Sequence, residues 1–153
     1  MKFSTREDIE APIESVFEML CDFEVYERAA MRRGAEIRRT DDLANPGLSA
    51  AWNVRFVMQG KERDVALEVV SFDPPDEIKI ALNSRNIIGT AQLELFALSR
   101  NRTRILVGIE VTPITLKARL FLQSLKLKKA SLTRQYKDRV AGYVKELEER
   151  HQA

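Results

Sequence analysis

The sequence of 153 residues has little of what most catalytic centres need: one cysteine, one histidine and six glycines. Cys21 has no partner for an internal disulfide, which is typical of a reducing compartment. His151 lies third from the end, where chain ends fray, and one histidine with one cysteine does not complete a usual zinc site. The glycines are scattered singly, which argues against a glycine-rich phosphate loop. We therefore expect no metal, no cofactor and no nucleophilic dyad.

Long apolar runs are also missing. No stretch approaches the roughly 18 apolar residues of a membrane-spanning helix, and residues 1–8 lack the apolar centre of a signal peptide. We therefore expect a cytoplasmic protein. A chain of this length buries about 70% of its unfolded surface on folding, which is enough for one core. We expect residues 1–153 to form a single domain.

The net charge of +2 is unevenly distributed along the chain. Residues 1–27 hold eight acidic and two basic residues, whereas residues 113–139 hold eight basic residues and one acidic residue. Two interpretations stay open. In the first interpretation, the two segments either attract each other within the fold or are solvated faces. In the second, the basic segment binds anionic lipid or an acidic partner.

Periodicity predicts the elements. Alternation of period two, bounded by turn residues, favours strands, and apolar residues at i, i+3 and i+4 favour helices. A first strand over 3–10 is followed by two short helices over 13–20 and 23–33, with Gly34 as a left-handed helix end. The remaining predicted strands cover 35–41, 50–59, 62–72, 77–82, 87–98 and 103–112.

The C-terminal segment carries the strongest helical pattern. Its apolar stripe predicts one long amphipathic helix from Pro113 to Glu149, with Thr112 as its N-cap. About 35 residues would span roughly 50 Å, so a bend or a separate first turn is compatible with the pattern. The stripe consists of Phe121, Leu122, Leu125, Leu132, Tyr136, Val140, Tyr143, Val144 and Leu147.

Three segments carry a resemblance to a known family. They are residues 9–22 (IEAPIESVFEMLCD) with Tyr26 four positions on, the turn 72–76 (FDPPD), and the terminal helix. Together they resemble the START and polyketide cyclase/dehydrase (SRPBCC) superfamily, which includes the birch pollen allergen family. The resemblance implies an α+β helix-grip fold, in which a curved seven-stranded antiparallel sheet grips one long C-terminal helix around a cavity for lipids, hormones, polyketides or other apolar molecules. Many members look non-catalytic. Residues 27–29 (ERA) replace the family's usual aromatic or Pro-Trp pair, so we expect this side of the pocket mouth to differ.

Strand alternation indicates which residues face the helix. If the apolar faces turn inward, almost no ionisable side chain points into the interior, and either a packed core or a ligand cavity fits that pattern. The candidate ligand-binding residues are Trp52, Val54, Phe56, Met58, Leu93, Leu95, Val107, Ile109, Leu125, Leu132 and Tyr136.

Three functions stay open. The first is a non-catalytic binding or carrier protein for a small apolar molecule or lipid. The second is an interaction module for an anionic membrane surface or a partner protein, because Leu116, Leu120 and Leu127 lie opposite the main stripe and are flanked by lysines and arginines.

The third is a cyclase- or dehydratase-type enzyme acting on a polyketide-like substrate. It rests on the resemblance and on Tyr26, Tyr136 and Tyr143, whose phenols could donate to a carbonyl oxygen. Nucleic acid is not favoured as a partner, because no aromatic residues are interspersed among the arginine clusters.

Overall fold

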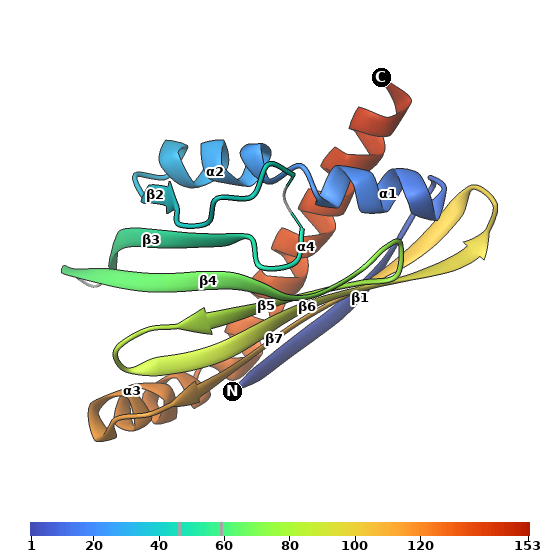
Figure 1. Cartoon of the computed structure of the whole chain (residues 1–153). Helices are drawn as coiled ribbons and strands as arrows, with labels where there is room; N and C mark the ends of the chain where they lie inside the picture. The colour runs from blue at the N-terminus through green and yellow to red at the C-terminus, as the bar shows by residue number, and fades with distance from the viewer. Residues whose placement is uncertain (46, 59) are drawn as a thin grey trace.

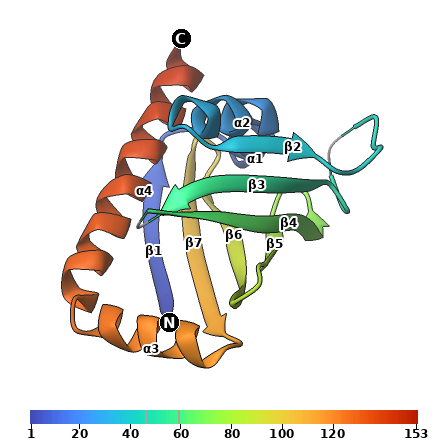
Figure 2. The same ribbon diagram turned by 90° about the vertical axis from the view of Figure 1, so that its left-hand side faces the viewer.

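The computed structural model describes residues 1–45, 47–58 and 60–153. In this part of the chain the strands form one sheet, and the helices lie at its ends and along one side (Figures 1 and 2). The elements are β1 (Lys2–Ile9), α1 (Ile13–Leu20), α2 (Phe23–Arg32), β2 (Glu36–Arg39), β3 (Ala51–Met58), β4 (Lys61–Asp73), β5 (Glu77–Asn83), β6 (Ile87–Ser99), β7 (Arg102–Pro113), α3 (Leu116–Lys126) and α4 (Lys129–Gln152).

The sheet has seven antiparallel strands in the order β1-β7-β6-β5-β4-β3-β2. The first strand therefore lies beside the last, and the chain then returns through consecutive hairpins. In Figure 2, α4 runs alongside β1, α1 and α2 lie toward its C-terminal half, and α3 crosses the opposite end. The α+β architecture predicted from periodicity is confirmed, with both short helices after β1.

Register pairing places the predicted apolar faces together. Trp52 lies opposite Leu67, and Leu67 lies opposite Leu82, so these three side chains share one face of the sheet. Two register shifts interrupt the ladders, between Val69 and Ser71 in β4 and between Ala97 and Ser99 in β6. Such irregularities increase the local twist and bend of a strand, which helps a sheet curve around a helix.

The C-terminal segment differs from the single helix predicted over 113–149. Residues 112 and 113 belong to β7, and α3 begins after Thr115, whose hydroxyl accepts a hydrogen bond from the Ala118 amide at 3.1 Å. A break then follows, because Lys128 adopts φ −109° and ψ 17° before α4 begins. A straight helix of about 50 Å would extend well beyond the end of β1, because the 8 residues of this strand span only about 27 Å. The break instead lets α3 fold back toward β7 while α4 follows β1.

The core lies between the sheet, α1 and the C-terminal half of α4. Its fully buried side chains include Ile9, Leu20, Ile78, Ile105 and Leu147. Apolar positions three or four residues apart on each helix supply this face.

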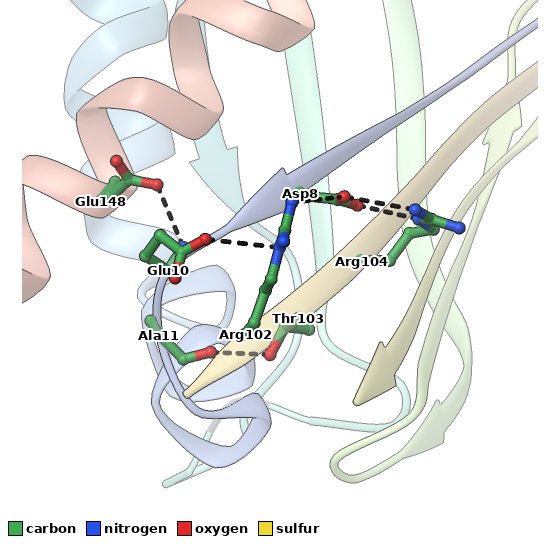
Figure 3. A network of polar contacts seen from close by, with 7 residues as sticks. All are labelled: Asp8, Glu10, Ala11, Arg102, Thr103, Arg104 and Glu148. Atoms are coloured by element: carbon green, nitrogen blue, oxygen red, sulfur yellow. Dashed lines mark hydrogen bonds and ion pairs between the residues drawn. The ribbon is translucent and has the colours of Figure 1, made fainter. Parts of the chain in front are cut away.

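A network of hydrogen bonds and ion pairs lies at the edge of this core (Figure 3). Buried Thr103 donates a hydrogen bond to the Ala11 carbonyl at 2.8 Å. The Glu10 amide donates to the Glu148 carboxylate at 3.0 Å, and Asp8 accepts from Arg104 at 2.8 Å. Together these contacts join β1, β7 and α4 at the point where the chain leaves the sheet for α1.

Candidate functional site

A cavity of about 430 Å³ lies between the sheet, α2 and α4. Most of its wall is aliphatic or aromatic, and every strand except β1 contributes to it. The lining residues are Leu20, Phe23, Tyr26, Glu27, Ile37, Trp52, Leu67, Ile78, Ile80, Leu93, Ile105, Val107, Tyr136, Arg139, Val140, Tyr143, Val144 and Leu147. We call this space the first cavity. Its volume falls within the range of small-molecule sites.

Trp52 is the most firmly held part of this wall. Its indole nitrogen donates to the Glu27 carboxylate at 2.8 Å, and the Phe23 ring meets it edge-on with centroids 5.1 Å apart. The Arg39 guanidinium lies 5.3 Å from the centroid of the Trp52 ring, and an ion pair with Asp41 at 2.6 Å orients that guanidinium. A hydrogen bond, an edge contact and a cation–π contact therefore fix the indole in one position.

The hydroxyl groups in the first cavity are mostly engaged with one another or with the backbone. Tyr136 donates to the Val107 carbonyl at 2.8 Å, and Tyr143 is hydrogen-bonded to Tyr26. Because the last two hydroxyls share one hydrogen bond, one O–H hydrogen of the pair stays available to a ligand. The Tyr26–Tyr143 pair can therefore offer a hydrogen bond to one acceptor, such as a carbonyl oxygen.

Burial determines the charge state of this pair. Loss of solvent raises the pKa of the Tyr26 hydroxyl, and burial likewise raises the pKa of Tyr143. Both phenols therefore stay protonated at neutral pH, so each can donate a hydrogen bond but cannot act as a general base. Glu27, the carboxylate in the wall, is engaged by Trp52. The arrangement is suited to holding an apolar molecule by one polar atom.

The candidate residues from the sequence are divided between several places. Trp52, Leu93, Val107 and Tyr136 line the first cavity. Phe56 and Met58 line a second, larger cavity at the α3 end, and Val54 and Leu95 pack in the core. In the described part of the chain, Ile109, Leu125 and Leu132 line neither cavity.

Several wall residues were missed by alternation along the strands. Phe23, Tyr26 and Glu27 come from α2, and Arg139 and Val140 come from the face of α4 that looks into the hollow. The spacing of Phe23, Tyr26 and Glu27 at i, i+3 and i+4 is the signal that could have placed them on one helix face. Which helix face meets the sheet depends on packing and cannot be read from spacing alone.

Other kinds of site are limited by the residues present. Among the described residues, no three histidine, cysteine, aspartate or glutamate side chains are grouped to hold a metal ion. Desolvation raises the pKa of the Cys21 thiol to about 11, so it is protonated and unreactive at neutral pH. The described part of the chain contains no helix that is both long enough and apolar enough to cross a bilayer.

Comparisons with solved structures establish the fold. The chain is similar to a point mutant of norcoclaurine synthase from Thalictrum flavum in complex with a transition-state analogue, with a TM-score of 0.69 and 9% identity, covering 100% of this chain and 96% of that one. It is similar to the Zhui aromatase/cyclase from Streptomyces sp. R1128, with a TM-score of 0.63 and 13% identity, covering 95% and 93%. A START superfamily protein from Mycobacterium smegmatis matches with a TM-score of 0.55 and 15% identity, covering 88% and 95%.

No protein-family description and no curated protein matches the chain by sequence. The structural likeness therefore concerns the fold alone. The chain has the helix-grip fold seen in START-like and aromatase/cyclase-like proteins, which confirms the predicted resemblance at the level of architecture.

Proposed function

We propose that this protein binds a small apolar molecule in the first cavity and acts as a carrier without catalysing a reaction. The observation that supports this most is an apolar space of about 430 Å³ whose rigid wall includes Trp52. The Tyr26–Tyr143 pair adds one hydrogen-bond donor, so the best ligand has an apolar body and a single acceptor atom. The norcoclaurine synthase structure, whose fold is similar, is in complex with a transition-state analogue, which supports the binding of a small molecule by this fold.

Native mass spectrometry of protein purified from cells without detergent tests the proposal. We expect an excess mass that disappears on denaturation. The variant Val107→Phe places a larger ring in the first cavity and should lose this mass, whereas Val57→Phe, at a position 72% exposed outside this cavity, should keep it. An excess mass retained by Val107→Phe would show that the ligand lies elsewhere.

We propose as a second function that α3 docks on an anionic phospholipid surface. Leu116, Leu120 and Leu127 are 70%, 58% and 89% exposed, so folding leaves the predicted leucine ridge in solvent. Lys117, Arg119, Lys126 and Lys128 flank this ridge. An exposed apolar ridge between cations is typical of helices that lie at membrane interfaces, where each cation contributes about 1 kcal/mol.

Cosedimentation with vesicles tests the second function. We expect binding to vesicles of phosphatidylserine and phosphatidylcholine, weaker binding to phosphatidylcholine alone, and a several-fold loss in Leu120→Gln/Leu127→Gln. The control Leu98→Gln changes an exposed leucine in the β6–β7 hairpin, which lies far from α3 in Figure 1, and should bind like the parent. Equal sedimentation with both vesicle types would contradict docking through charge.

A further inference from the structure

A second cavity of about 660 Å³ lies at the α3 end of the molecule. It is enclosed by the β3–β4 hairpin, the β5–β6 turn, the end of β7 and α3. Part of its wall is apolar, but it carries more charged side chains than the first cavity, where Glu27 and Arg139 are charged. The charged lining of the second cavity consists of Lys61, Glu62, Arg63, Asp64, Arg85 and Lys117. The apolar lining consists of Phe56, Met58, Val65, Leu82, Ile87, Val111, Ala118 and Phe121.

Two cations of β4 point toward this cavity. Lys61 lies opposite Met58 and Arg63 lies opposite Phe56 in the β3–β4 ladder, so these cations share a face with apolar residues. Arg63 is half-buried, and its Nε donates to the Met58 carbonyl at 3.4 Å. A lysine and an arginine on the inner face interrupt the apolar pattern that the rest of β4 keeps through Val65 and Leu67.

The two acids of the cavity lining, Glu62 and Asp64, are engaged by a cation of β3. Glu62 and Asp64 alternate with the two cations, and both pair with Arg55, at 3.3 Å and 3.1 Å. Among the described residues, no carboxylate lies within 4.0 Å of a charged nitrogen of Lys61, Arg63, Arg85 or Lys117, the cations that line the second cavity.

A further cation reaches the same place from α3. Lys117 stands in the first turn of α3, which contains no acidic residue, so its charge adds to the positive end of the helix dipole. The side-chain hydrogen-bond contact with Lys61, followed by the like charges of Lys61 and Arg63, holds the pKa of Lys117 below its ordinary range. These cations have no paired carboxylate among the described residues, so they repel one another. Such an unfavourable cluster is expected at a site where a ligand supplies the opposite charge.

We propose that the second cavity binds the anionic head of an amphipathic molecule, a carboxylate or phosphate group, with the attached alkyl chain lying on Phe56, Met58 and Phe121. The head would be held by Lys61, Arg63 and Lys117, and a guanidinium is suited to binding either anion through two parallel hydrogen bonds. This site differs from the first cavity in place and in chemistry, so either one can fail without the other.

Titration calorimetry with single-chain amphiphiles below their micelle concentration tests the proposal. The probes are dodecanoate, dodecyl phosphate, neutral dodecanol and inorganic phosphate. We expect the two anionic amphiphiles to bind at least about tenfold more tightly than dodecanol or inorganic phosphate. We also expect their binding to weaken as salt rises from 50 to 500 mM, with little change for dodecanol.

A charge-matched pair of variants locates the site. Lys61→Gln/Arg63→Gln/Lys117→Gln should lose about tenfold or more in dodecanoate affinity. Arg32→Gln/Arg33→Gln/Arg38→Gln removes the same charge from exposed residues outside the cavity lining and away from α3, and should lose less than about twofold. Because the first variant relieves repulsion, it should fold; the single change Lys117→Gln, at an exposed position, provides a milder version.

Parental dodecanoate affinity in the cavity variant, or equal losses in both variants, would overturn the proposal. Dodecanol binding as tightly as dodecanoate would show that the charges are not used. Inorganic phosphate binding as tightly as dodecyl phosphate would show a site for a free anion and would overturn the role of the apolar wall.

Discussion

Tyr26 and Tyr143 are the residues through which the first cavity can recognise a polar atom. Their hydroxyls are hydrogen-bonded to each other, and burial raises the pKa of both, which keeps them protonated. A ligand with a carbonyl group would use the one remaining O–H hydrogen. A hydrocarbon of the same shape would gain nothing from it.

The double variant Tyr26→Phe/Tyr143→Phe, which removes both hydroxyls, should therefore weaken the binding of a ketone about three- to tenfold, in line with a net hydrogen bond of about 1 kcal/mol. Binding of the matching hydrocarbon should stay within about twofold. Titrations with 2-decalone and decalin measure this difference. Tyr136→Phe is the control, because the hydroxyl of Tyr136 is already bonded to the Val107 carbonyl. Equal losses for ketone and hydrocarbon would contradict a specific role for the pair.

Asp8 contributes a pH dependence to stability. Its hydrogen bond with Arg104 holds the pKa of the carboxyl below the ordinary value of 3.8, despite an opposing effect of desolvation. A carboxyl with a lower pKa in the folded state stabilises the fold above its unfolded-state pKa, and this contribution is lost as pH falls through the folded-state value.

Asp8→Asn should consequently be less stable than the parent at pH 7, and the two should converge as pH falls below about 4. Urea unfolding between pH 7 and pH 3 measures the free energies of both proteins. Asp73→Asn, at an exposed carboxyl in the last residue of β4, serves as the control. A constant difference between parent and Asp8→Asn across this range would show that the ion pair is not the cause.

At the scale of elements, β7 is tied to the entry of α1 by one buried hydrogen bond. Thr103 is fully buried and donates to the Ala11 carbonyl at 2.8 Å. Thr103→Val keeps the shape and leaves that carbonyl unpaired, so we expect a loss of about 1–3 kcal/mol in the free energy of unfolding. Urea unfolding checks this value. Thr90→Val, at an exposed position in β6, should change stability by less than about 0.5 kcal/mol.

The elements also show what periodicity can predict. The strand and short-helix boundaries in the described residues agree with the prediction to within about two residues, because alternation and turn residues are local signals. Residue 59, the predicted end of the strand 50–59, lies outside the described residues. The sequence pattern allows a bend in the C-terminal segment but does not place it at Leu127–Lys128, because neither residue is a glycine or proline and both suit a helix. The break arises from the length of β1 and the position of β7, which are properties of the packed molecule.

The site was predictable only in part for a related reason. The shared face of Trp52 and Phe56 follows from alternation, yet Trp52 lines the first cavity and Phe56 lines the second. Sequence indicates which way a strand residue points, but not which helix lies above it. Because the C-terminal segment divides into α3 and α4, the hollow over the sheet is divided as well.

For the molecule as a whole, the described residues show no ion pairs that hold the acidic segment 1–27 against the basic segment 113–139. Asp8 and Glu10 pair instead with Arg102 and Arg104. The basic residues of α3 therefore stay available at one end of the molecule, around the second cavity. The apolar first cavity lies toward α2 and the C-terminal half of α4.

We propose that the first cavity takes up a small apolar ligand. Trp52 is the one tryptophan and stands in the wall, so titration with N-phenyl-1-naphthylamine can be followed by energy transfer from Trp52, and Val107→Phe assigns the signal to this cavity. We expect saturable one-site quenching in the parent and in Val57→Phe, and its loss in Val107→Phe. Absence of saturable quenching in the parent, or equal quenching in Val107→Phe, would contradict this proposal.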